Sequence, residues 1–220
     1  MTKLFKTLTL SAAAAAIVLS AGVSSAMDLR APQQGGLLTH IAANAASSEV
    51  EGAKNFIAGM GERGINFLGN QNMSMDAKKA EFAKLLNDSF DMNTISRFSL
   101  GQYWKSATPA QQKEYQKLFN AMVVKVYSNR FSEYKGQKFD VRTARKENDK
   151  DAIVTSYIVP NDGPEVRVDW RVRNKGGVYK VVDIIVEGVS MGQTQRADFA
   201  SVIQRGGGNI EALLNHLRKQ

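Results

Sequence analysis

The sequence predicts an α+β fold, with N-terminal helices packed on a C-terminal four-stranded antiparallel, twisted sheet. Between residues 48 and 134, apolar residues recur at every third or fourth position, which is the period of a helix with one buried side. From Phe139 onward they alternate at every second position, as in half-buried strands, with short turns between the runs. Helices followed by consecutive strands are typical of α+β layer structures.

The first 26 residues predict a secretory signal peptide. Lys3 and Lys6 precede an apolar run from Leu8 to Leu19, and Ser24 and Ala26 supply small residues for cleavage. A retained membrane anchor is the weaker alternative, because the apolar run is too short to span a bilayer. No cysteine follows the small residues, so lipid attachment there is excluded. We therefore expect an exported protein that begins near Met27.

Residues 27–47 carry no sustained apolar period and predict a flexible lead-in to one domain at residues 48–220. The first helix is expected to begin at Ser48, with Glu51 completing a capping box. Ser74 is expected to cap a second helix, and Asp91 a third that ends at Gly101.

The strongest helix signal begins at Thr108, where Pro109 and Gln111 complete a capping box with proline at the first helical position. Apolar residues then follow at spacings of three and four, which predicts one long amphipathic helix up to Gly136.

Four strands are expected after this helix, joined in a meander by turns rich in Asn, Asp and Gly. They cover Phe139–Thr143, Ala152–Val159, Val166–Val172 and Val178–Val186. A helix from Thr194 to Gly206 and a short one from Asn209 to Leu217 complete the chain. A twisted sheet folded over the long helix leaves a concave face, where we place any ligand.

Composition limits the classes of function. Without Lys3 and Lys6 the formal net charge falls from +8 to about +6, and the charges are interspersed, as on a well-solvated surface. Nucleic acid is the least favoured partner of such a surface. Because the chain has no cysteine, disulfides and thiolate metal sites are excluded.

Two glycine motifs resemble catalytic or nucleotide-binding signatures. Gly188–Gly192 matches the G-x-S-x-G turn of hydrolases, but His40 and His216 are far away in sequence and the sheet is not parallel. Gly59–Gly64 matches G-x-G-x-x-G, but it follows a helix instead of a strand, so it cannot form a phosphate-binding loop. We expect neither motif to carry chemistry, and two distant histidines provide no metal site.

Asp169 and Asp183 lie on neighbouring predicted strands, and a carboxylate in an apolar cavity can act as a general base. Because apolar residues alternate with both, we expect the two carboxylates to face outward and to pair with Arg167, Arg171 or Lys180.

Aromatic and methionine side chains are numerous for one domain. They would either fill a core or line a deformable apolar cavity. Periodicity alone leaves both alternatives open. The residues in question are Phe56, Phe119, Met122, Tyr127, Phe131, Tyr157 and Trp170.

Several short motifs together resemble the MlaC, or toluene-tolerance, family. The resemblance covers nearly all of the chain from Ser48 to Leu217 and keeps the order and spacing of the motifs. The motifs are Phe90–Asp91, Arg97–Trp104, Tyr115–Phe119, Val168–Val172, Val186–Met191 and Gln195–Phe199.

This resemblance implies an NTF2-like cone with an internal apolar cavity for lipid acyl chains. It also implies a monomeric, soluble periplasmic carrier, without catalytic activity or a cofactor, that maintains outer-membrane lipid asymmetry. Its partners would be phospholipid, an outer-membrane lipoprotein complex, and an inner-membrane ABC transporter with a membrane-anchored lipid-binding subunit. We expect the acyl chains to contact Phe56, Phe119, Met122, Val123, Tyr127, Phe131, Tyr157, Val166, Val168, Trp170 and Ile184.

Two alternatives remain. One is a carrier of another lipid, such as a hopanoid, because relatives of this family serve those pathways. The other, from a different class of protein, is an NTF2-like enzyme that uses Asp169 or Asp183 as a base.

Overall fold

The computed structural model describes the backbone of residues 36–220 and the side chains from residue 47 onward. The predicted signal peptide and residues 27–35 of the predicted lead-in lie outside the described residues. From Leu37 to Gln220 the chain forms one unit.

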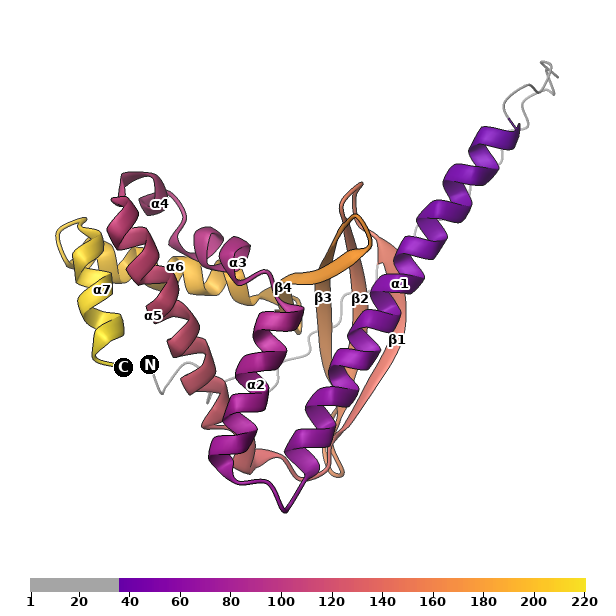
Figure 1. Ribbon diagram of the computed structural model, residues 1–220, viewed down its shortest axis with the longest axis horizontal. Helices are drawn as coiled ribbons and strands as arrows, with labels where there is room; N and C mark the ends of the chain where they lie inside the picture. The colour runs from indigo at the N-terminus through magenta and orange to yellow at the C-terminus, as the bar shows by residue number, and fades with distance from the viewer. Residues whose placement is uncertain (1–35) are drawn as a thin grey trace, which may run out of the picture. The chain divides into compact units, whose positions relative to one another are not determined.

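This unit is α+β, as predicted (Figure 1). The strands form one antiparallel sheet in the order β1-β2-β3-β4-β5, so the predicted meander is confirmed and a two-residue fifth strand is added. The helices before the sheet are α1 (Gly36–Gly69), α2 (Met75–Ser89), α3 (Met92–Leu100), α4 (Tyr103–Ser106) and α5 (Pro109–Ser128), followed by the 3₁₀ turn η1 (Phe131–Glu133). The strands are β1 (Lys138–Lys146), β2 (Asp151–Val159), β3 (Val166–Lys175), β4 (Val178–Val186) and β5 (Val189–Ser190), and the last helices are α6 (Met191–Arg205) and α7 (Ile210–Arg218).

Three helix starts follow the predicted capping chemistry. The Ser74 hydroxyl accepts from the Ala77 N–H at 3.2 Å, and the Asp91 carboxylate accepts from the Thr94 N–H at 2.9 Å. Thr108 and Gln111 form the full capping box, each side chain accepting from the other's backbone N–H. These bonds satisfy N–H groups that have no partner inside the helix, and they fix where α2, α3 and α5 begin.

Two predicted helix boundaries are wrong. The first helix begins at Gly36 instead of Ser48, so residues 36–47 of the expected flexible lead-in are helical. The long helix α5 ends at Ser128, eight residues before Gly136. Past Ser128 the chain turns through η1 and brings the Phe131 ring within 5.9 Å of Phe67 and 5.4 Å of Phe82. Tertiary packing of this ring thus outweighs a helical pattern that continues in the sequence.

Two bulges shape the sheet. Register shifts occur between Val141 and Thr143 of β1 and opposite Arg171–Val172 of β3, which makes Arg142 and Val182 extra residues. Such bulges increase the local twist of the strands. In the described residues β1 is an edge strand, and its side chains are mostly charged and exposed.

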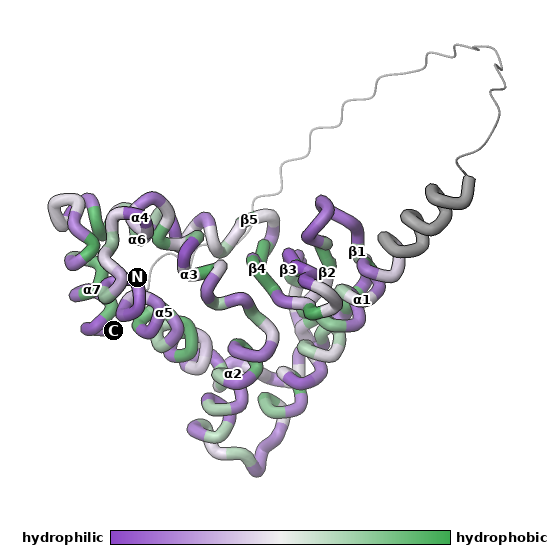
Figure 2. Tube along the Cα trace, turned by 45° about the horizontal axis from the view of Figure 1, so that its top comes forward, coloured by the Kyte–Doolittle hydropathy of each residue, from purple (hydrophilic) through white to green (hydrophobic). Residues whose placement is uncertain are grey.

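The apolar side chains form two clusters. One joins α1 and α2 to one face of the sheet, through Ala53, Ile57, Leu85, Val154 and Val181 among others. The other lies among α3, α5, α6 and α7, where Tyr115, Phe119 and Phe199 pack ring against ring. Figure 2 shows hydrophobic positions alternating with hydrophilic ones along α1 and α5, as expected of helices that bury one side.

Candidate functional site

The face of the sheet that packs against α1, here called the inner face, is mostly apolar, with Ser156 as a buried polar residue. At one end, Ala152, Val172 and Val181 are buried in the same cluster as Ala53 and Ile57 of α1. The alternation of the strands sends their charged residues to the other face, here called the outer face. The alternation of apolar and charged residues in the sequence therefore gives the sheet an apolar inner face.

The other end of the inner face is less well covered. Ile158 is 39% exposed, and its neighbours on β3 and β4 are half-buried. The register sets Ile158 opposite Val166, Val168 opposite Val186, and Trp170 opposite Ile184. We call this surface the open apolar face: Ile158, Val166, Trp170, Ile184 and Val186.

Trp170 adds a polar group to this face, its indole N–H, and that group has a hydrogen-bond partner. The indole N–H donates to the Ser156 hydroxyl at 2.8 Å, and that hydroxyl donates to the Val168 carbonyl at 3.3 Å. The Phe139 ring packs edge-on against Trp170, with the centroids 5.9 Å apart. Because the Trp170 N–H already has a partner, the open apolar face offers a ligand hydrocarbon contact only.

Four aromatic rings form a second apolar group, where α1, α2 and the end of α5 meet. Phe131 contacts Phe67 and Phe82, and the Tyr127 ring lies 6.3 Å from Phe82. Tyr127 remains 42% exposed, so this group reaches the surface between α2 and α5.

A pocket of about 290 Å³ lies between α1 and α2. Phe67, Met73 and Leu85 give it an apolar floor, and Arg63, Asn66, Asn70 and Glu81 give it a polar rim. Sites for drug-sized ligands measure about 300–1,000 Å³. As the structure stands, this pocket is therefore too small to enclose a large amphiphile.

The structure divides the predicted site residues between the two clusters. Val166, Val168, Trp170 and Ile184 share the inner face of the sheet, and Phe56 and Phe131 pack into the same cluster. Phe119, Met122 and Val123 belong instead to the cluster among the helices, because that side of α5 faces α6 and α7. Tyr127 lies at the surface against Phe82.

Tyr157 does not share the inner face with the other predicted strand residues. It pairs with Arg167 on the outer face, and the Arg142 guanidinium lies over its ring at 3.9 Å from the centroid. Strand alternation puts Tyr157 on the face opposite its neighbour Ile158. Ile158, Val186 and Phe82 are not in the predicted set, although the same alternation places Ile158 and Val186 on the inner face.

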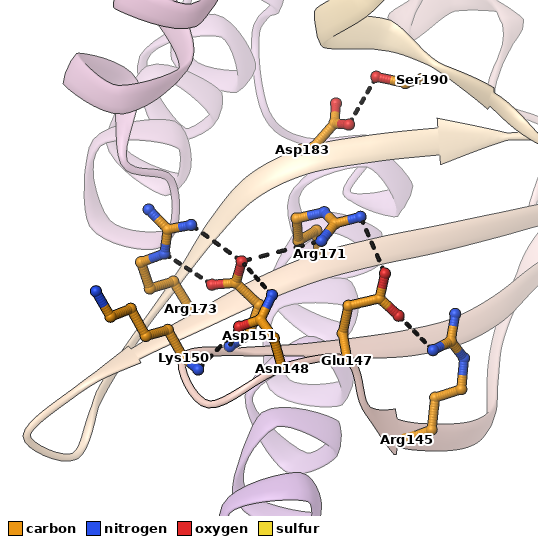
Figure 3. Close-up of polar contacts among 9 residues, drawn as sticks. All are labelled: Arg145, Glu147, Asn148, Lys150, Asp151, Arg171, Arg173, Asp183 and Ser190. Atoms are coloured by element: carbon orange, nitrogen blue, oxygen red, sulfur yellow. Dashed lines mark hydrogen bonds and ion pairs between the residues drawn. The ribbon is translucent and has the colours of Figure 1, made fainter.

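The outer face carries a network of charges (Figure 3). Arg173 forms a two-pronged ion pair with Asp151 at 2.7 and 3.0 Å, and Arg171 contacts Glu147 at 3.3 Å. Burial opposes ionisation of Asp151, but Arg173, Asn148 and Arg171 outweigh it and keep the pKa of Asp151 below its usual value. Arg145, Arg171 and Arg173 each contact a carboxylate of this network, so it links β1, β2 and β3.

The two strand carboxylates face outward, as expected. Asp169 pairs with Arg167 at 3.0 Å and accepts from the Thr155 hydroxyl at 2.6 Å. Asp183 was predicted to pair with a cation, but within the described residues it forms no ion pair and accepts from the Ser190 hydroxyl at 2.6 Å (Figure 3). It also accepts from the Gly192 N–H at 3.0 Å. Both carboxylates are therefore engaged in holding strands or the start of α6.

The Gly188–Gly192 motif forms the N-terminus of α6. The Ser190 hydroxyl accepts from the Gln193 N–H at 3.1 Å as the helix cap. Asp183 is the acceptor of its proton, and no histidine takes part in these contacts. Gly59–Gly64 lies inside α1, where a phosphate-binding turn cannot form. In the part of the chain that the structure describes, no group of three His, Asp or Glu residues could hold a metal ion.

Within residues 36–220, no helix combines the length and hydrophobicity that crossing a membrane requires.

Known proteins resemble this chain in sequence. The family model described as MlaC protein matches residues 63–219. The toluene tolerance protein ttg2D of Pseudomonas putida is 29% identical over 133 residues, which cover 60% of this chain and 62% of that protein. The intermembrane phospholipid transport system binding protein MlaC of Haemophilus influenzae is 25% identical over 124 residues, covering 54% and 57%. The matches thus span about three fifths of the length of these relatives.

A solved structure shares the fold. The phospholipid-binding protein from Ralstonia solanacearum, determined in complex with a phospholipid, superposes with a TM-score of 0.66 at 23% identity. The match covers 76% of this chain and 95% of that one.

Proposed function

The chain belongs to the MlaC family, and we propose that it is a periplasmic carrier that binds phospholipid by its acyl chains. The open apolar face is the observation that supports this role, because it offers partly exposed hydrocarbon surface with no unsatisfied polar group. The relatives' names, which refer to phospholipid binding and intermembrane phospholipid transport, agree with it.

The physical need for such a carrier is large. Each methylene group costs about 0.8 kcal/mol in water, so a free two-chain lipid crosses an aqueous compartment too rarely to be useful. An apolar sheath around the chains removes most of this cost. A bilayer is equally apolar, so the sheath must match the bilayer closely, or release at the second membrane becomes slow.

Loading requires the protein to open. The pocket between α1 and α2 measures about 290 Å³, and the two clusters are otherwise packed, so a two-chain lipid needs additional space. The open apolar face adjoins α1 and α2 through one shared cluster. We infer that these two helices move apart from each other and away from the sheet when lipid enters.

We further propose that the carrier exchanges lipid with an outer-membrane lipoprotein complex and an inner-membrane ABC transporter with its lipid-binding subunit. Transport of this kind contains no bond-breaking step, and neither Asp169 nor Asp183 is assigned a catalytic role.

The test is native mass spectrometry of protein purified from the periplasm without detergent. We expect an adduct of phospholipid mass that organic extraction removes. A Val166→Trp variant places a bulky side chain on the open apolar face, so we expect it to carry less lipid. Val178→Trp is the matched control, because Val178 is 58% exposed at the turn between β3 and β4.

Wild-type protein that carries no phospholipid, even after incubation with phospholipid vesicles, would overturn the proposal. An adduct with the mass of a hopanoid would show that the cargo is a hopanoid instead of a phospholipid. If Val166→Trp and Val178→Trp carry equal amounts of lipid, the acyl chains bind elsewhere than on the open apolar face.

A further inference from the structure

A second exposed surface lies where α3, α4 and the first half of α6 meet. Phe98 of α3 is 42% exposed, because Ser96, Ser99 and Leu100 occupy the buried side of that short helix. One edge of its ring rests on α6, where a Cβ atom added to Gly192 would lie 3.2 Å from ring atoms. The ring is therefore held in place while much of it faces solvent.

Two arginines are held against aromatic rings around Phe98. The Arg196 guanidinium lies 5.5 Å from the Phe98 centroid, and the Arg97 guanidinium lies 5.2 Å from the Trp104 centroid. Gly101 makes room for Arg196, since a Cβ atom there would lie 2.6 Å from the arginine Nε. Lys105 follows Trp104 and is exposed. We call this surface the α3–α6 patch: Arg97, Phe98, Trp104, Lys105 and Arg196.

The cations of the α3–α6 patch differ from those of the sheet. Arginines 142, 145, 167, 171 and 173 each pair with at least one carboxylate. Among the described residues, no carboxylate lies within ion-pair distance of Arg97, Lys105 or Arg196. Asp183, which is near Gly192, is engaged by Ser190 and the helix N-terminus. The patch therefore presents three positive charges that form no ion pair in the described residues, beside an exposed aromatic ring.

We propose that the α3–α6 patch docks the protein on the surface of an anionic phospholipid bilayer. Cations near such a surface are attracted by its negative potential, and exposed Phe and Trp side chains insert at the boundary between headgroups and acyl chains. A bilayer supplies phosphate groups and an apolar phase side by side, which matches this combination. A soluble phosphate ester supplies the charge but offers the Phe98 ring no apolar phase.

This docking is separate from lipid carriage. The patch shares no residue with the open apolar face, and its binding to a membrane requires no cavity. The two proposals can therefore fail independently.

The test measures cosedimentation of the mature protein with vesicles. One vesicle type is phosphatidylcholine alone, and the other contains about one third phosphatidylglycerol. We expect binding to the anionic vesicles that weakens as salt is raised. Each arginine near the surface contributes about fivefold in affinity, so Arg97→Gln combined with Arg196→Gln should bind about 30-fold more weakly at low salt.

A charge-matched control is available in Arg205→Gln combined with Lys138→Gln. Both residues are exposed and form no carboxylate pair in the described chain, and they lie at the end of α6 and the start of β1. This variant should keep most of the binding.

Phe98→Ser, which removes an exposed ring and should fold, is expected to weaken binding at every salt concentration while keeping the salt dependence.

The proposal is overturned if wild-type protein does not bind anionic vesicles at low salt, or if the patch variant binds as well as the control. If soluble glycerophosphoglycerol competes for the patch as strongly as added anionic vesicles do, the patch is a site for a free phosphodiester and not for a bilayer. Binding to polyglutamate without vesicle binding would point to an acidic protein partner instead.

Discussion

Two glycines of α1 mark the points where this helix approaches the sheet most closely. A Cβ atom on Gly52 would lie 2.2 Å from the Tyr179 hydroxyl, and one on Gly61 would lie 2.2 Å from the Phe139 ring. Tyr179 is on β4 and Phe139 is on β1, so α1 crosses the sheet from one side to the other.

We expect Gly61→Ala to destabilise the protein by about 1–3 kcal/mol, because the added methyl group overlaps the Phe139 ring. Gly59→Ala is the matched control, since no atom lies within 4 Å of the position that its methyl group would take, and alanine favours helix by about 0.5–1 kcal/mol. Urea unfolding of the two variants compares them. A stabilising Gly61→Ala would show that α1 does not pack on Phe139 in solution.

Asp151 makes part of the stability dependent on pH. Its pKa is lowered in the folded protein, so its contribution is present above the unfolded pKa and is lost as the pH falls through the folded value. We expect Asp151→Asn to lower the free energy of unfolding by about 2 kcal/mol at neutral pH. The difference from wild type should shrink below about pH 4, where the carboxyl group becomes protonated.

Urea unfolding at neutral and acidic pH measures this effect. Asp149→Asn serves as control, because the Asp149 side chain is 98% exposed in the same turn and should change stability by less than about 0.5 kcal/mol. A constant difference between wild type and Asp151→Asn across the pH range would contradict the assignment.

At the scale of elements, α1 and α2 are joined across their outer sides by an ion pair between Arg63 and Asp88 at 3.0 Å. Both side chains are about half exposed, so the pair contributes at most about 1 kcal/mol. Lys180 of β4 also donates to the Asn87 and Asp88 carbonyls at the end of α2. These contacts oppose the movement of α2 that we propose for lipid entry.

We therefore expect Asp88→Lys to speed lipid exchange with vesicles by up to about fivefold, because it replaces an attraction to Arg63 by a repulsion. Transfer of a fluorescent phospholipid measures the rate. Glu211→Lys breaks a comparable exposed pair with Arg218 within α7, which packs in the cluster among α3, α5 and α6, and should leave the rate unchanged. Combining Asp88→Lys with Arg63→Glu restores opposite charges and should restore the rate; a rate still raised in that double variant would exclude the ion pair as the cause.

The elements were largely predictable because local chemistry defines them. Caps at Ser74, Asp91 and Thr108, and alternation from Phe139 to Val186, are properties of neighbouring residues. The end of α5 was not predictable, since it depends on Phe131 reaching Phe67 and Phe82, which are far away in sequence. The division of the predicted site between two clusters has the same origin: Phe119 and Trp170 are equally apolar, and only tertiary packing assigns each to its cluster.

In the unit from Leu37 to Gln220, the two apolar clusters stabilise different helices and strands. Phe199 is fully buried among the helices, and Val154 is fully buried under α1. We expect Phe199→Ala to cost about 3–5 kcal/mol and to lower amide-exchange protection in α5, α6 and α7 more than in β2 and β3. Val154→Ala should show the reverse order. Equal loss of protection in both regions would indicate one cooperative core.

The edge strand β1 has a consequence for a protein that displays apolar surface in a crowded compartment. An unpaired strand edge is a template on which a second copy can extend the sheet, and exposed hydrocarbon makes such encounters more frequent. The extra residue Arg142 interrupts the spacing of hydrogen-bonding groups along β1, and lysines 138 and 146 and Arg145 bring repulsive charge to any partner edge. The strand at the edge of the sheet thus carries features that disfavour extension of the sheet by a second copy.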